Sequence, residues 1–319
     1  MEAGSEASCT PRARTLRLDL AYEGTAYHGF GKQPSRLTVQ EVLEEALARS
    51  FGEQVRVIPA GRTDTGVHAD GQVVSFTTRG HLAPDELLRA VNAHLPQDVL
   101  VHGAAEMPPE FDARRSAIRR HYRFLIWRHR FPSLWWRRWA WHQTVQLDLA
   151  AMQLAADQLV GTHDFGSFVG SRSDDEPGRS SIRAVERAQW WRDGNLIGFE
   201  ITANAFLRHM VRGIVGTLVE VGRGRLDPAQ LGAILQAGDR RRAGANAPPH
   251  GLTLVRVDYP THFEAPAYES EPSERYGQAF GPGARALGAE SGASDSGRSS
   301  VLAEGSVDVI GGRRATGVS

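Results

Sequence analysis

The sequence predicts an α+β fold made of two similar halves, each an antiparallel sheet with helices on one side, with a cleft between the halves. Three observations support this prediction. Short runs in which apolar and polar residues alternate are interleaved with runs of helical periodicity. The order of these elements in the first half recurs, with longer elements, in the second. The length of 319 residues allows two packed domains and a substantial core.

The N-terminal half, residues 15–110, is predicted to contain four strands and two helices. The segment Thr38–Glu41 fits a capping box, so the first helix should begin there and end near Gly52. Pro84 suits the first turn of the second helix, and Pro96 should close that helix. Alternating or β-branched runs indicate strands at residues 15–22, 55–58, 72–78 and 98–104.

The C-terminal half, residues 111–262, repeats this order with longer elements. The turn Asp193-Gly194-Asn195 is typical of a hairpin that joins two antiparallel strands. His163 and Asp164 are interpreted as a structural turn after a helix. Helices are predicted at residues 148–160, at 206–221 and from Asp227 onward, and strands at 116–127, 182–191, 196–203 and 252–259.

Both ends of the chain, residues 1–14 and 263–319, are predicted to be disordered. The C-terminal segment consists largely of Gly, Ser, Ala, Glu and Pro, and it cannot bury enough apolar surface to order itself. It carries eight acidic residues and five arginines, although the whole chain has 37 acidic and 37 basic residues. The remaining body, with 29 acidic and 32 basic residues, is therefore mildly basic.

The composition indicates a cytoplasmic protein. Cys9 is the only cysteine, which excludes an internal disulfide and any metal site built from several cysteines. No apolar run approaches the roughly 18 residues of a membrane span. The N-terminus lacks the apolar centre of a secretory signal. We therefore expect neither a membrane association nor a bound metal.

The segment AGRTDTGVHA, residues 60–69, carries the strongest candidate for a reacting group. Asp64 lies in this segment between two predicted strands, where a loop can hold a side chain in a fixed orientation. Gly61 and Gly66 allow unusual backbone angles, and Arg62 supplies a cation that would favour the ionised carboxylate. Local chemistry alone favours the alternative, in which Asp64 is a turn residue that hydrogen-bonds its own backbone.

A basic and aromatic segment, residues 113–141, is a candidate for RNA contact. It holds nine arginines, no acidic residue and five of the seven tryptophans. Arginines suit phosphates and aromatic rings suit unstacked bases. Within this segment we expect Arg114, Arg119 and Arg120 to bind the nucleic acid. The alternative is a solvated basic strand flanked by core tryptophans.

Several motifs, spread over most of the first 260 residues, resemble the tRNA pseudouridine synthases of the TruA family. These motifs are AGRTDTGVHA at 60–69, FDARRSAIRRHYRFLI at 111–126, ANAFLRHMVRGIVG at 203–216 and APPHGLTL at 247–254. One departure lies in residues 27–34, where this chain has Phe30 and Gly31 in place of the family's usual Trp and Gln. The resemblance implies the RRM-like or ferredoxin-like pseudouridine synthase fold.

The resemblance also implies roles for individual residues. Asp64 would act as the catalytic nucleophile or base, and Arg212 would pair with it. Tyr122 would stack on the target uracil and assist proton removal. Leu252 would form an apolar wall beside the base, and Arg62 would fill the gap that the base leaves in the RNA. From the residues alone, Tyr122 also fits a core-edge tyrosine. Arg212 lies six residues after Phe206 in the predicted helix, so it would project from another side than the stripe of Phe206 and Met210, towards a polar surface or a buried acid. The alternative is an ordinary helix-surface arginine.

The implied substrate is tRNA, at uridines 38 to 40 of the anticodon arm, and the implied assembly is a homodimer. The isomerisation of uridine to its C-glycoside adds and removes nothing, so no cofactor is expected. Attack at C6, attack at C1′ and a glycal route all fit a single carboxylate. Two other functions remain open from the residues: a non-catalytic RNA-binding protein with RRM-like halves, and an Asp-dependent hydrolase.

Overall fold

The computed structural model describes residues 12–170 and 180–263, which all belong to one compact unit. The strands are β1 (Arg14–Tyr22), β2 (Ile58–Pro59), β3 (His68–Thr78), β4 (Val99–Met107), β5 (Arg119–Arg128), β6 (Trp141–Gln143), β7 (Gly161–Asp164), β8 (Ile182–Asp193), β9 (Leu196–Ala203) and β10 (Leu252–Asp258). The α-helices are α1 (Val39–Phe51), α2 (Pro84–Asn92), α3 (Leu149–Asp157), α4 (Met210–Gly222) and α5 (Gln230–Ala237). The α+β class predicted from the sequence is confirmed.

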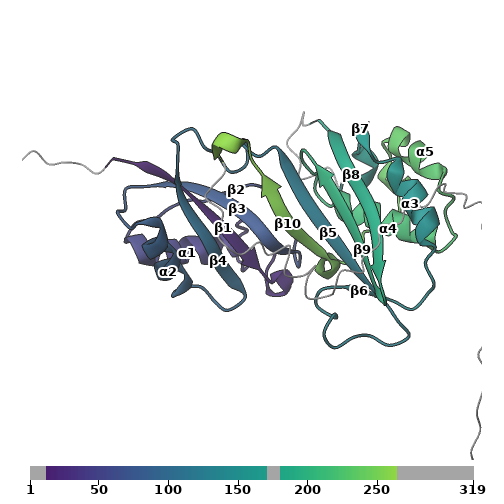
Figure 1. The fold of residues 1–319 in the computed structure, drawn as a ribbon, viewed down its shortest axis with the longest axis horizontal. Coiled ribbons are helices and arrows are strands. Elements are labelled where there is room, and N and C mark those ends of the chain that lie inside the picture. The colour runs from purple at the N-terminus through teal and green to yellow at the C-terminus, as the bar shows by residue number, and fades with distance from the viewer. Residues whose placement is uncertain (1–11, 171–179, 264–319) are drawn as a thin grey trace, which may run out of the picture. The chain divides into compact units, whose positions relative to one another are not determined.

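The strands of both halves form one continuous sheet, in the order β4-β1-β3-β10-β5-β9-β8-β7 (Figure 1). The strand β10 lies in the middle, parallel to β3 and antiparallel to β5. The antiparallel sheets expected for the two halves are thus joined into one. The strands β10 and β3 are joined where Thr253 pairs with His68. These residues lie far apart in the chain, and no local sequence pattern encodes such a pairing.

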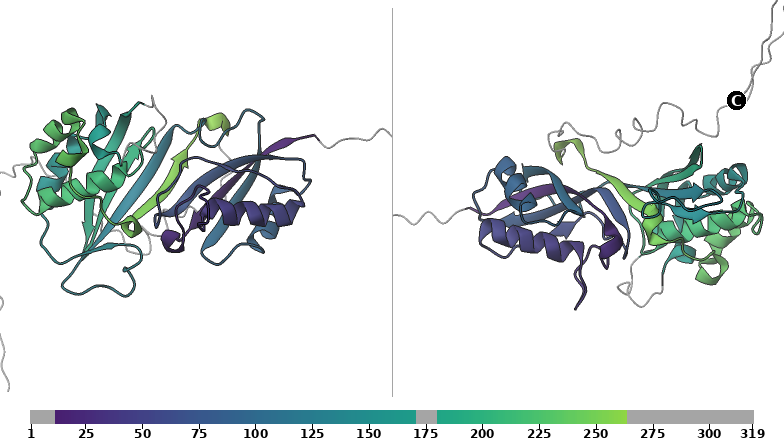
Figure 2. Two further views of the ribbon diagram at one scale, coloured as in Figure 1. Left: turned by 180° about the vertical axis from the view of Figure 1, so that it is seen from behind. Right: turned by 90° about the horizontal axis from the view of Figure 1, so that it is seen from below.

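The helices cover one face of this sheet. Seen from behind, α1 lies across the strands of the N-terminal half and α4 beside those of the C-terminal half (Figure 2). The helix α1 buries Val39, Leu43 and Leu47, at the spacing of one helical face. Nearly all of α4 is buried, from Met210 to Gly222, so it forms the centre of the C-terminal half.

The predicted caps Thr38 and Asp148 are confirmed, whereas α5 begins at Gln230, after Ala229, and not at Asp227. The Thr38 hydroxyl accepts the backbone N–H of Glu41 at 3.3 Å, and Gly52 ends α1 in the left-handed conformation, with φ of 69°. The Asp148 carboxylate accepts the N–H of Ala151 at 3.0 Å and so begins α3. These local signals determine where the two helices begin.

Several predicted boundaries are wrong. The strand β3 already begins at His68, because its first residues pair with β10. His163 and Asp164 lie on β7, an edge strand that pairs with β8, and not in a turn. The helix α4 begins at Met210 rather than Phe206, because His209 has a left-handed backbone with φ of 63°. Of the strand expected at 55–58, only Ile58 lies in a strand, as the first residue of β2.

The predicted disordered ends, with Cys9, lie outside the described residues except for residues 12–14 and Phe263. Arg14 is the first residue of β1. Phe263 is buried, and its ring lies 5.3 Å from that of Phe111, so the ordered body extends to this residue. Within residues 12–170 and 180–263, no helix is long and apolar enough to cross a membrane.

Candidate active site

The loop that carries Asp64 connects β2 to β3 and is fixed by hydrogen bonds on both sides of the carboxylate. At its start, the N–H of Ala60 donates to the carbonyl of Val73 at 2.8 Å. The Thr63 hydroxyl bonds the Tyr22 hydroxyl at 2.8 Å, inside the core. Beyond Asp64, the N–H of Gly66 donates to the carbonyl of Tyr27 at 3.2 Å. The backbone on each side of Asp64 is therefore tied to the sheet and to the segment before α1.

Two glycines allow this loop to pack closely. Gly66 has φ of 77°, and a Cβ atom there would lie 3.1 Å from Cγ of Pro249. Gly29 has φ of 88°, and a Cβ atom there would lie 2.7 Å from the carbonyl oxygen of Thr63. Gly61 has no positive φ, and its Cβ position is open, so the freedom expected of this residue is not used.

Asp64 and Arg212 meet, as the sequence predicted. One guanidinium nitrogen of Arg212 lies 3.4 Å from Oδ2 of Asp64, and the two side chains are only 15% and 18% exposed. Nε of Arg212 donates to the carbonyl of Ala247 at 2.8 Å, and the N–H of Ala247 donates to the carbonyl of Arg212 at 2.9 Å. The guanidinium is therefore held in one orientation, pointing at the carboxylate.

The geometric argument that supported Arg212 was wrong in one respect. Phe206 precedes α4 and is not part of its apolar stripe. Its ring packs edge-on against Tyr122, at a centroid distance of 5.0 Å. Arg212 is the third residue of α4, near the end of the helix that faces the Asp64 loop. This position brings its guanidinium to the carboxylate.

His209 is a site residue that the sequence reasoning missed. Its Nε2 lies 3.7 Å from Oδ1 of Asp64, whereas Arg212 hydrogen-bonds the other oxygen, Oδ2. Burial lowers the pKa of the His209 imidazole below its ordinary value of 6.5, although the charge of Asp64 opposes this shift. Its position three residues before Arg212 in the same motif was the available signal.

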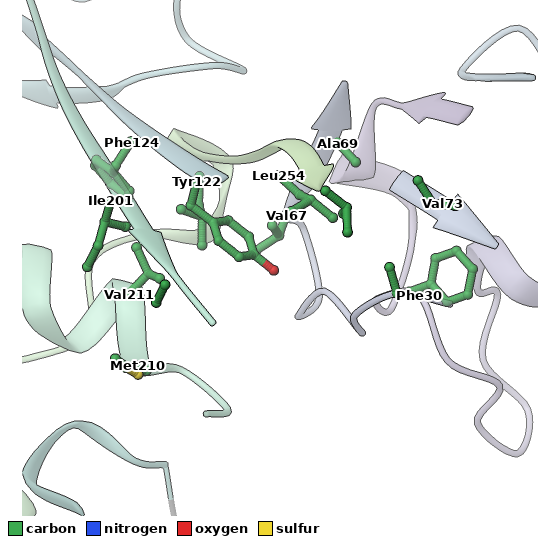
Figure 3. Packing of buried hydrophobic residues seen from close by; sticks show 14 of the residues in the cluster. Phe30, Val67, Ala69, Val73, Tyr122, Phe124, Ile201, Met210, Val211 and Leu254 are labelled. Carbon is green, nitrogen blue, oxygen red and sulfur yellow. The ribbon is translucent and has the colours of Figure 1, made fainter. Parts of the chain in front are cut away.

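Tyr122 lies on β5 in the middle of the sheet. It pairs with Ile201 of β9 on one side and with Leu254 of β10 on the other, and Figure 3 shows its ring among these residues and Val67. Burial raises the pKa of the Tyr122 phenol, and the charges of Tyr22 and Asp64 add to the rise. The phenol therefore keeps its proton at neutral pH, which suits stacking better than the predicted removal of a proton.

Leu252 and Tyr122 share one face of the sheet. Leu252 is buried at the start of β10, opposite Phe124, and Phe124 lies two residues after Tyr122 on β5. Its placement is compatible with the predicted apolar wall.

Arg62 is exposed, and the ion pair of Asp64 is made with Arg212 instead. A Cβ atom at Gly31 would lie 3.2 Å from Cδ of Arg62, so the small residue at position 31 leaves room for this side chain. Phe30 is fully buried and packs near Tyr22, with ring centroids 6.2 Å apart. Of the two positions that depart from the family, Phe30 is therefore a core residue and Gly31 lies beside Arg62.

The structure separates the three arginines that were expected to bind RNA. Arg114 is exposed after β4. Arg119 lies on the face of β5 opposite Tyr122, and its Nε donates to Glu186 at 2.6 Å. Arg120 is only 8% exposed, and its guanidinium donates to four backbone carbonyls. This geometry corrects the expectation for Arg120, because a guanidinium so enclosed cannot reach a phosphate.

The site contains one carboxylate flanked by an arginine and a histidine, beside a buried tyrosine. Within residues 12–170 and 180–263, no group of three or more His, Cys, Asp or Glu side chains is arranged to hold a metal ion. Such a site can supply a nucleophile or a general base from Asp64 and an apolar platform from Tyr122.

Comparisons with known proteins agree with this chemistry. The chain matches the family model described as tRNA pseudouridine synthase over residues 20–114 and 155–260. It is 45% identical over 246 residues to tRNA pseudouridine synthase A of Moorella thermoacetica, covering 76% of this chain and 99% of that protein. The homologue of the same name from Methylobacterium nodulans is 45% identical over 245 residues, covering 76% of this chain and 95% of that protein.

Among solved structures, the crystal structure of an archaeal box H/ACA sRNP complex matches with a TM-score of 0.30. The identity is 11%, and the match covers 75% of this chain and 57% of that chain. This likeness is too distant to carry an argument. Asp64 and Arg212 both fall within the segments of the family match, while Tyr122 falls between them.

Proposed function

The chain belongs to the tRNA pseudouridine synthase family, and on this premise we propose that Asp64 is the group that reacts with the target uridine. The protein is an isomerase that acts on tRNA. The observation that supports the role of Asp64 most directly is its ion pair with Arg212, formed between two motifs 148 residues apart. The family assignment does not favour a non-catalytic RNA-binding protein.

The reaction breaks the N1–C1′ bond, turns the uracil, forms the C5–C1′ bond and removes the proton from C5, while N1 gains a proton. Asp64 serves this sequence as a nucleophile at C6 or C1′, or as a general base in a glycal route. Because Arg212 hydrogen-bonds Oδ2, the other oxygen, Oδ1, is the one proposed to meet the nucleotide. Arg212 keeps the carboxylate oriented through each step.

Three further residues are proposed to hold the nucleotide. Tyr122, with a neutral phenol, stacks on the uracil, and Leu252 limits the pocket on the same face of the sheet. Arg62 is exposed and lies on the Asp64 loop, two residues before the carboxylate. This position suits a side chain that enters the RNA where the base has left the stack.

We propose that the substrate uridines are those at positions 38 to 40 of the anticodon arm, that the protein acts as a homodimer and that it works in the cytoplasm. These three proposals come from the resemblance of the motifs to the TruA family. Mapping the modified positions in one tRNA, and measuring the mass of the protein in solution, tests the first two directly.

The experiment for the catalytic role uses tRNA labelled with tritium at C5 of uridine. The wild-type protein should release tritium without any change in the mass of the RNA. Asp64→Asn should abolish the release while tRNA binding survives, and Asp85→Asn, at the start of α2, serves as the matched control. Tritium release by Asp64→Asn at the wild-type rate would remove Asp64 from its role. Free uracil or cleaved RNA would indicate a hydrolase instead.

A further inference from the structure

The two oxygens of the Asp64 carboxylate face different partners. Oδ2 lies 3.4 Å from a guanidinium nitrogen of Arg212, whose positive charge is permanent. Oδ1 lies 3.7 Å from Nε2 of His209, whose charge depends on pH. The oxygen proposed to meet the nucleotide is therefore the one that faces a titratable group.

The backbone holds the His209 imidazole in this position. His209 has φ of 63°, a conformation that few residues other than glycine adopt and that costs on the order of 1 kcal/mol or more. Its carbonyl accepts the N–H of Gly213 at 2.9 Å, in the first turn of α4. Strain of this kind persists only where the surroundings fix it, and it is concentrated at functional sites.

A glycine makes room for the ring on its other side. A Cβ atom at Gly170 would lie 2.3 Å from Nδ1 of His209, so only glycine fits beside the imidazole. The N–H of Gly170 donates to the carbonyl of Arg208 at 3.2 Å, which ties this segment to the residue before the histidine. The imidazole thus lies between the backbone of Gly170 and the carboxylate of Asp64.

The charges around His209 come from several elements. Among the described residues, Asp64 faces it from the loop between β2 and β3, and Arg212 from α4. Arg208 lies in the segment before that helix, and Arg240 lies in the 3-10 helix Arg240–Arg242. The three arginines stay charged throughout the physiological range, so His209 is the member of this group whose charge changes there. Burial and the arginines together lower the pKa of His209, so its imidazole is neutral at pH 7.

We propose that His209 is a positioning residue that governs access to Oδ1 of Asp64. When the imidazole is neutral, this oxygen is free to meet the nucleotide. When the imidazole is protonated, it forms a second ion pair with this oxygen. The inference rests on the proposed role of Asp64. A carboxylate held between two cations is a weaker nucleophile and a weaker base, because both cations stabilise its charge in the ground state. The reaction should therefore stop at acidic pH because the His209 imidazole is protonated there.

The test is the pH profile of single-turnover tritium release from C5-labelled tRNA, with the enzyme in excess. The wild-type rate constant should fall below pH 6.5 and approach a tenfold loss per pH unit, the slope of one titrating group. His209→Asn removes the titration, and asparagine tolerates the left-handed backbone. The ratio of its rate constants at pH 5.5 and pH 7.5 should be several-fold closer to one than the wild-type ratio.

Two further variants make the result decisive. His209→Gly, which adopts the left-handed backbone without strain, should give the same flattened profile and replaces His209→Asn if that variant does not fold. His163→Asn on β7 is the matched control and should keep the wild-type profile. An unchanged acidic limb in the folded His209 variants would overturn the proposal. Activity of Asp64→Asn at pH 7.5 would overturn the proposed function instead, so the two failures are distinguishable.

Discussion

At the scale of single residues, the Asp64 carboxylate depends on a guanidinium that is itself oriented. Arg212 donates from Nε to the carbonyl of Ala247 at 2.8 Å and from a terminal nitrogen towards Asp64 at 3.4 Å. A lysine carries the same charge but has no planar fork, so it cannot keep both contacts in fixed directions. The geometry of the pair, and not only its charge, should therefore matter for the reaction.

We predict that Arg212→Lys lowers the single-turnover rate of tritium release by about 100-fold, the order of loss when one oriented electrostatic partner is removed. The dissociation constant for tRNA should change little, because Arg212 is only 15% exposed. Arg223→Lys, at the end of the same helix, is the control. A rate for Arg212→Lys equal to that of the wild-type protein would show that charge alone is sufficient.

His68 is a buried titratable residue at the start of β3, directly after the loop that carries Asp64. Its Nδ1 accepts the N–H of Gly24 at 2.9 Å, so the ring proton is on Nε2, which faces the carbonyls of Arg138 at 2.8 Å and His250 at 3.2 Å. The ring also packs on Trp139, with centroids 4.3 Å apart. A second ring proton would point at the N–H of Gly24, which is a donor as well.

Burial lowers the pKa of His68 below 6.5, so the unfolded chain binds a proton more readily than the folded protein. The stability that the neutral ring contributes is complete above pH 6.5 and is lost as the pH falls below that value. We predict that the free energy of unfolding in urea decreases from pH 7 to pH 5 with a slope from this residue of up to about 1.4 kcal/mol per pH unit.

The matched comparison for this prediction uses two glutamine variants. His68→Gln should be less stable than the wild-type protein at pH 7 but should lose less further stability by pH 5. His163→Gln, which changes a histidine on the edge strand β7, should follow the wild-type dependence. Equal pH dependence in all three proteins would assign the acid sensitivity to other groups.

At the scale of elements, local chemistry predicted some of the structure and long-range pairing decided the rest. Thr38 and Asp148 cap their helices as expected, because an N-cap acts within three residues. The start of β3 and the strand β7 were missed, because pairing with β10 and β8 makes these segments strands. The start of α4 was misplaced because the left-handed backbone of His209 has no signature in the sequence.

The connection between β5 and β6 presents large apolar side chains to solvent. Trp135 is 88% exposed and Leu134 is 81% exposed. The neighbouring Arg130 and Arg137 are also exposed, and the segment 113–141 contains no acidic residue. An aromatic ring among arginines suits a base of the tRNA that is not stacked in a helix.

We predict that Trp135→Ala raises the dissociation constant for tRNA by about tenfold, within the range measured for loss of one stacking contact. The single-turnover rate at saturating enzyme should remain as in the wild-type protein, since the residue lies outside the proposed catalytic site. Leu154→Ala, which removes another exposed apolar side chain from α3, is the control. Unchanged tRNA affinity together with a lower oligomeric mass would instead identify Trp135 as a contact between protein copies.

At the scale of the whole molecule, the motifs indicated which residues meet, but not the continuous sheet that brings them together. The resemblance of residues 60–69 and 203–216 to one family correctly placed Asp64 against Arg212. The charge pattern of residues 113–141, in contrast, did not separate the two faces of β5. Alternation along a strand directs Arg119 and Arg120 to opposite sides, and composition alone does not show which side is buried.

Arg120 links three segments that carry the motifs. Its guanidinium donates to the carbonyls of Ala60 at 2.9 Å, Arg114 at 2.7 Å and Asn204 at 2.7 Å. A fourth bond, to the carbonyl of Ala117, measures 3.0 Å. Ala60 begins the loop of Asp64, and Asn204 belongs to the motif of Arg212. One buried side chain therefore joins the backbone of the Asp64 loop to that of the segment before Arg212.

We predict that Arg120→Met lowers the free energy of unfolding in urea by at least about 3 kcal/mol, because each carbonyl left without a donor costs about 1–3 kcal/mol. Arg119→Met changes the neighbouring residue, whose side chain is 41% exposed and paired with Glu186, and should cost less than about 1 kcal/mol. If the two variants were equally stable, the carbonyl contacts of Arg120 would not hold the halves together. A large loss confined to Arg120→Met would instead show that the buried carbonyl contacts of Arg120 hold the Asp64 loop to the segment before α4.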